Sequence, residues 1–187
     1  MNFFEKHRRH ILRLVLSGMM LALALVLPFL TGQIQTIGSM LCPMHLPVML
    51  CGFICGPVWG AVVGVVAPIL RFAIFSMPPL FPIGLSMAAE LAVYGLVCGV
   101  LSRILVKKTS IKRVFGLYIS LVSAMVLGRV AYGVVRFALC AGRGISYTFA
   151  MFLTGTVVEA IPGIVIQLVL VVPLVLAADK LTRDRDL

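Results

Sequence analysis

Residues 46–75 read LPVMLCGFICGPVWGAVVGVVAPILRFAIF, a nearly unbroken apolar stretch interrupted by a Gly-Pro step at Gly56 and Pro57. A membrane helix needs about 20 residues, so the length of this stretch allows either one span or two short ones. We interpret it as two helices, near 46–58 and 61–75, with a tight turn at the Gly-Pro step. The choice follows from the basic residues elsewhere in the chain.

Two basic segments set the expected topology. They are Lys6, Arg8, Arg9 and Arg13 before the first apolar run, and Arg103, Lys107, Lys108, Lys112 and Arg113 in a later loop. Cytoplasmic loops of membrane proteins are enriched in Lys and Arg. A single span over 46–75 would place the two segments on opposite sides of the membrane. Two spans place both inside, so the sequence predicts six helices with both termini in the cytoplasm.

The composition agrees with an all-α integral membrane protein. The 187 residues are 61% hydrophobic and 12% charged, with a mean hydropathy of +1.15, whereas about a quarter of a soluble domain is charged. We expect one membrane domain over residues 1–187, with the first run retained as a helix and the last helix tilted or kinked at Pro162. The predicted helices lie near 11–30, 46–58, 61–75, 82–106, 114–139 and 147–178.

Several classes of function are disfavoured by the sequence. The formal charge of +10 comes from residues that flank apolar runs, which indicates membrane topology and not a nucleic-acid surface. No G-x-x-x-x-G-K-[ST] phosphate loop, H-E-x-x-H or G-x-S-x-G motif occurs, and no Asp lies in a predicted span. We therefore expect no catalytic residue, metal site or cofactor in this chain. Most of the five cysteines are expected to be small buried side chains.

Five ionisable residues fall inside the predicted spans, where a strong charge costs about 2.5 kcal/mol or more. They are Arg71, Glu90, Arg129, Arg136 and Glu159. Counted from the predicted outer helix ends, all five belong to the outer half or the midplane of the membrane. They come from four helices, which indicates a polar pocket open to the outside.

Helical spacing groups these residues with two tyrosines. Arg129, Tyr132 and Arg136 are spaced i, i+3, i+7, and Glu90 and Tyr94 are spaced i, i+4, so each set shares one helical face. Three arginines against two glutamates leave one positive charge. The pocket is therefore expected to favour an anionic ligand such as a carboxylate, which arginine binds bidentately.

Each of these residues also has a purely structural interpretation. The charges can be ion pairs that join helices, and Arg71 and Arg136 lie close enough to helix ends to reach the interface. His45 can contact ligand or be an ordinary boundary residue. Gly18 and Ala22 form a small-residue strip on which another helix can pack, although such spacings are common.

The stretch 45–82, HLPVMLCGFICGPVWGAVVGVVAPILRFAIFSMPPLFP, followed by MAAELAVYG at 87–95, resembles the substrate-binding S components of energy-coupling factor (ECF) vitamin transporters. The resemblance implies a six-helix membrane protein that binds a vitamin at its outer side. The ligand would lie beneath the three outer connections, which we predict at 31–45, 76–81 and 140–146.

The resemblance also implies partners in a prokaryotic cytoplasmic membrane. These are a transmembrane coupling protein and two ATPases, which use the ATP that this chain cannot bind. In the family an A-x-x-x-A strip on the first helix docks the coupling protein, and the corresponding positions here are Gly18 and Ala22. Glycine in place of the first alanine keeps the residue small.

The ligand is the least determined part of the prediction. The sequence looks most like the pantothenate branch of the family, and the surplus positive charge also favours a carboxylate vitamin. Cobalamin is the second choice. Two other classes stay open: an autonomous proton-coupled carrier in which Glu90 and Glu159 titrate, and a structural membrane protein that binds no small molecule.

Overall fold

A computed structural model of the chain describes residues 3–30, 41–108, 112–158 and 160–183, and these residues are helical with no β-strand. The helices are α1 (Phe3–Leu30), α3 (His45–Ile54), α4 (Pro57–Phe75), α5 (Leu85–Lys108), α6 (Arg113–Ala141), α7 (Phe149–Leu153) and α8 (Ile161–Arg183). Two π-helical segments, η1 (Leu80–Gly84) and η2 (Thr154–Val158), precede α5 and follow α7. The predicted all-α class is confirmed for these residues.

Five helical segments of the described chain are long and apolar enough to cross a membrane. They are His10–Phe29, Pro57–Phe75, Leu80–Leu105, Arg113–Ala141 and Ile161–Lys180. The remaining predicted span, 46–58, corresponds to α3, which has ten residues and so a length of only about 15 Å. Most of α3 is buried, from His45 to Gly52. A helix surrounded by other helices does not need to match the thickness of the lipid.

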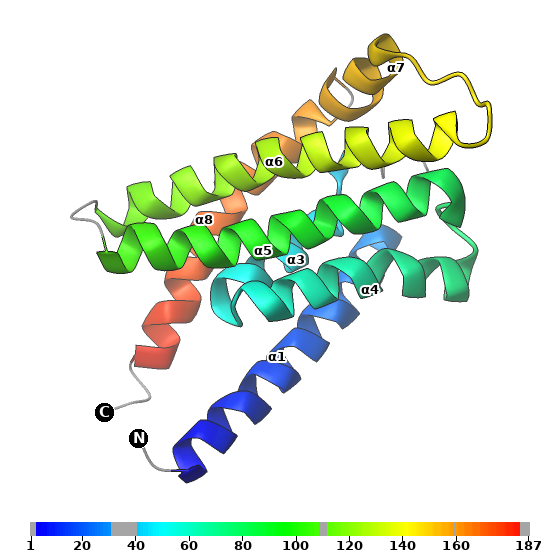
Figure 1. Cartoon of the computed structure of the whole chain (residues 1–187). Helices are drawn as coiled ribbons and strands as arrows, with labels where there is room; N and C mark the ends of the chain where they lie inside the picture. The colour runs from blue at the N-terminus through cyan, green and yellow to red at the C-terminus, as the bar shows by residue number, and fades with distance from the viewer. Residues whose placement is uncertain (1–2, 31–40, 109–111, 159, 184–187) are drawn as a thin grey trace.

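The long helices form one bundle (Figure 1). Helices α4, α5 and α6 pack side by side, and α1 and α8 cross behind them with α3 in between. The main core is formed by buried side chains of α3, α5, α6 and α8, including Met49, Leu91, Leu121 and Val171. All five cysteines are buried, in agreement with the prediction for most of them.

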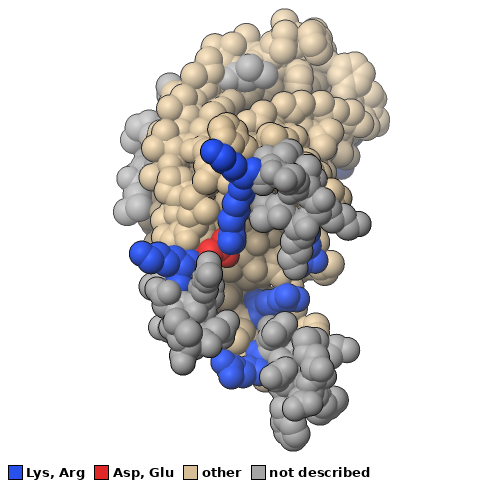
Figure 2. All heavy atoms as spheres, turned by 90° about the vertical axis from the view of Figure 1, so that its left-hand side faces the viewer, with Lys and Arg blue, Asp and Glu red and all other residues tan. Residues whose placement is uncertain are grey.

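One end of the bundle is basic, and we call it the basic end. Lys and Arg side chains surround an acidic side chain there (Figure 2). The helix ends at this end of the bundle carry the exposed cations Arg8, Arg103, Lys112, Arg113 and Lys180, and Arg113 pairs with Asp179. Helices α1 and α6 begin and helices α5 and α8 end at this same end (Figure 1). The opposite end carries η1, α7 and the connection between α6 and α7 (Figure 1).

Glycines bring α3, α4 and α5 into backbone contact. A Cβ on Gly95 would overlap the carbonyl of Gly60, one on Gly60 would stand 2.6 Å from the Cα of Gly52, and one on Gly52 would overlap the Gly95 carbonyl oxygen. The turn before α4 also requires glycine, because Gly56 has φ +108° and the Arg103 guanidinium occupies the position of its missing Cβ. Close backbone approach fixes the short α3 against its neighbours.

The last predicted helix, 147–178, is corrected by the structure. It is divided into α7, η2 and α8, with a turn at Ala160. Thr148 before α7 is extended, and Pro162 lies in the first turn of α8, where proline costs little because that turn lacks intrahelical N–H partners. The predicted kink at Pro162 is therefore a helix start.

Candidate functional site

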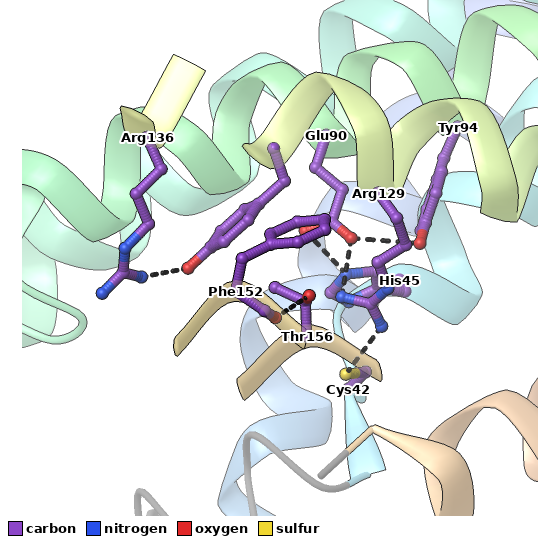
Figure 3. Close-up of polar contacts among 9 residues, drawn as sticks. Cys42, His45, Glu90, Tyr94, Arg129, Arg136, Phe152 and Thr156 are labelled. Atoms are coloured by element: carbon purple, nitrogen blue, oxygen red, sulfur yellow. Dashed lines mark hydrogen bonds and ion pairs between the residues drawn. The ribbon is translucent and has the colours of Figure 1, made fainter. Parts of the chain in front are cut away.

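A buried polar cluster joins three helices (Figure 3). Glu90 of α5 pairs with Arg129 of α6, with 2.8 Å between Oε1 and Nη1. Tyr94, one turn along α5, donates its hydroxyl to the same Oε1 at 3.0 Å. His45, the first residue of α3, places Nε2 3.6 Å from Oε2 of Glu90, which is beyond hydrogen-bond length. We call His45, Glu90, Tyr94 and Arg129 the Glu90 cluster.

The Glu90 cluster is largely shielded from solvent. Glu90 is 1% exposed, His45 2% and Tyr94 1%, and the side chain of Arg129 is 14% exposed. Burying a charge in an apolar interior is costly unless it is paired and hydrogen-bonded, and here each charge meets its opposite. The pair of Glu90 and Arg129 therefore carries no net charge.

Arg129 also reaches the segment before α3. Its Nη2 lies 3.9 Å from the Sγ of Cys42 (Figure 3). Cys42 has φ +47°, a left-handed conformation that is uncommon for a residue with a side chain, and its carbonyl oxygen accepts a hydrogen bond from the His45 N–H at 3.0 Å. Cys42 could not be predicted as a site residue from the sequence, because its place beside Arg129 depends on this turn.

Three nitrogens of the Glu90 cluster have no hydrogen-bond partner among the described residues. They are Nδ1 and Nε2 of His45 and Nε of Arg129, all buried. Buried polar atoms are nearly always hydrogen-bonded, so an unpartnered one calls for an explanation such as a ligand or a water molecule. These nitrogens are the polar groups that the cluster can offer to a bound molecule.

Arg136 forms a second polar group, nearer to the end of α6. Its Nη1 donates to the hydroxyl of Tyr132, and its guanidinium lies 4.9 Å from the ring centroid of Tyr147. It points away from the Glu90 cluster (Figure 3). Burial raises the pKa of the Tyr147 hydroxyl, which therefore stays protonated at neutral pH.

Arg136 differs from Arg129 in its electrostatics. The ion pairs found in the described part of the chain join Glu90 to His45, Glu90 to Arg129, and Arg113 to Asp179. None of these ion pairs includes Arg136. Its Nε is also buried and has no hydrogen-bond partner among the described residues. Among the described residues, Arg129 therefore pairs with a carboxylate, whereas Arg71 and Arg136 do not.

The other predicted site residues lie apart from these two groups. Arg71, near the end of α4, donates from Nε to the Met77 carbonyl oxygen at 3.3 Å and so supports the connection between α4 and η1. Gly18 and Ala22 are exposed on α1, away from its buried contacts. Glu159 lies outside the described residues.

The fold and the site together define a multi-pass helical membrane protein with a buried charged cluster. A protein-family model described as "ECF transporter, substrate-specific component" matches residues 12–175, which is most of the chain. The chain belongs to this family, and the resemblance identified from the sequence is confirmed at that level. No curated protein and no solved structure gives a significant match.

Family membership defines the general role of the chain. It is the substrate-binding subunit of an ECF transporter, not a catalyst, and it works with the coupling and ATPase subunits that such transporters use. Among the described residues, no group of three or more His, Cys, Asp or Glu side chains is arranged to hold a metal ion. The identity of the small molecule has to be argued from the site.

Proposed function

We propose that this S component captures a carboxylate-bearing vitamin at the end opposite the basic end, and that pantothenate is the first ligand to test. The observation that supports the proposal is the contrast between two arginines. Glu90 neutralises Arg129, whereas Arg136 has no carboxylate partner in the described structure. A cation without a counter-ion in a partly buried place favours an anionic ligand.

Each polar group has a proposed role. Arg136 holds the ligand carboxylate, and Tyr132 orients its guanidinium through the hydrogen bond from Nη1. The unpartnered nitrogens of His45 and Arg129 bind the hydroxyl or amide groups of the ligand. Glu90 and Tyr94 act as positioning residues for Arg129. For Glu159 and Arg71 a ligand contact remains a prediction.

The proposed orientation places the basic end in the cytoplasm of a prokaryotic cell. Loops rich in Lys and Arg stay on the cytoplasmic side, and the basic end holds the start of α1 and the end of α8 (Figures 1 and 2). The partners are a transmembrane coupling protein, docked along Gly18 and Ala22 of α1, and two ATPases that hydrolyse ATP. The chain itself needs no cofactor.

Ligand binding to the purified chain tests this proposal. In detergent, pantothenate at a hundredfold excess over its Kd should raise the free energy of unfolding by about 2.7 kcal/mol, because it binds only the folded state. The change R136Q should remove this stabilisation. R113Q is the matched control, since Arg113 pairs with Asp179 at the basic end and should leave the shift unchanged.

The panel should include cobalamin and other vitamins at the same excess. A shift with cobalamin alone would replace pantothenate as the ligand, and a pantothenate shift that survives R136Q would contradict the role of Arg136. If no vitamin stabilises the chain, the proposal of a carboxylate vitamin fails.

A further inference from the structure

An open hollow of about 580 Å³ lies between the C-terminal part of α6 and the segment that begins α7. Its walls are mostly aliphatic and aromatic and include Val130, Val134 and Phe137 on α6, with Tyr147, Phe149 and Phe152 opposite. The volume lies in the range of about 300–1,000 Å³ that small-molecule sites occupy. The hollow is large enough for a ligand of modest size.

The packing of α7 on α6 forms this hollow. Gly133 lets the Phe152 ring approach α6, since a Cβ there would stand 2.6 Å from the ring. Side chains around this contact remain open: Val134 is 62% exposed, and Phe149 is 69% exposed. The space beside the Gly133–Phe152 contact is therefore accessible to a ligand.

The hollow lies next to Arg136. Arg136 directly precedes Phe137 in α6, and its guanidinium lies 4.9 Å from the ring centroid of Tyr147, which lines the hollow as Phe137 does. No ion pair within the described residues includes Arg136, and its Nε is buried without a partner. Tyr147 thus contacts the positive charge of Arg136 and also forms part of the apolar wall of the hollow.

We infer that Arg136 and the α6–α7 hollow are the two halves of one site, which binds an amphipathic carboxylate with its anionic group on Arg136 and its apolar part in the hollow. The inference builds on the proposed function and specifies the chemical class of the substrate. The partly buried Arg136 suits a planar carboxylate better than the bulkier phosphate of a two-chain lipid. Val134 and Phe137 then set the size of the apolar part.

A series of straight-chain carboxylates from acetate to decanoate tests this site. We would measure their affinities for the full chain in nanodiscs of zwitterionic lipid. Affinity should rise about fourfold for each methylene group that enters the hollow. R136Q should weaken every member by about tenfold or more, because a hydrogen bond to a charged group is lost. Octanoate and pantothenate should compete, since both need Arg136.

A variant with a large side chain in the hollow tests whether the apolar part of the ligand binds there. V134W should flatten the dependence on chain length, whereas V126W should keep it, since Val126 is similarly exposed on α6 but does not line the hollow. If V134W does not fold, V130F tests the same wall. Equal chain-length dependence in filled and control variants would overturn the inference, because it would report partition into lipid.

Three further outcomes distinguish a carboxylate site from a lipid site and the further inference from the proposed function. If native mass spectrometry finds a phospholipid that V134W and R136Q release, and no carboxylate binds, the hollow is a lipid site and the inference is wrong. If pantothenate binds through Arg136 but chain length has no effect, the proposed function stands and the apolar half falls. If neither pantothenate nor octanoate binds, both fail.

Discussion

Replacing Glu90 by glutamine is expected to lower the free energy of unfolding by about 3–5 kcal/mol, because the change leaves Arg129 buried without its carboxylate. The pair is 2.8 Å long and Glu90 is 1% exposed, so water cannot take over the role of the carboxylate. Reversible unfolding of the detergent-solubilised chain, followed by circular dichroism, measures the loss.

The exposed pair of Arg113 and Asp179 is the matched control for Glu90. Its two side chains are 53% and 38% exposed, so D179N should cost no more than about 1 kcal/mol. The double change E90Q/R129M should recover much of the stability lost in E90Q, because no unpaired charge then remains. An E90Q protein as stable as the parent would show that the ion pair does not hold α5 and α6 together.

Replacing Gly95 by alanine is expected to cost about 3 kcal/mol, at the upper end for an overpacked core. The atoms that a Cβ would meet belong to the Gly60 backbone, so no side-chain rotation can relieve the overlap. Helices α4 and α5 would have to separate, and α3 would lose its support on both. The yield of folded protein and its thermal unfolding in detergent measure the effect.

Gly18 provides the control for Gly95. Nothing lies within 4 Å of the position of its Cβ, and alanine is favoured over glycine inside a helix by about 1 kcal/mol. G18A should therefore be neutral or stabilising. If G95A unfolds at the same temperature as G18A, the close backbone contact of α3, α4 and α5 is not present in the folded protein.

The sequence predicts contacts within one helix better than contacts between helices. The i, i+4 spacing of Glu90 and Tyr94, and of Tyr132 and Arg136, anticipates two hydrogen bonds that the structure contains. Which carboxylate pairs with Arg129 depends on the packing of α5 on α6. Helical periodicity carries no information about that packing, so the pair with Glu90 could not be deduced.

Two local features could not be predicted from the sequence. Cys42 reaches Arg129 because its backbone is left-handed, a conformation that its residue type does not suggest. The stretch 147–178 has the hydropathy of one span, yet the extended Thr148 and the turn at Ala160 divide it. The hollow beside Arg136 exists because of this division, so a continuous helix would not have predicted it.

Uptake by proteoliposomes distinguishes an S component from an autonomous carrier. The chain alone should bind its ligand but accumulate none of it, with or without a proton gradient. Accumulation should require the coupling protein, the two ATPases and ATP. If the chain alone accumulates ligand in response to a proton gradient and gains nothing from the partners and ATP, it is an autonomous carrier, and the roles proposed for its site residues are wrong.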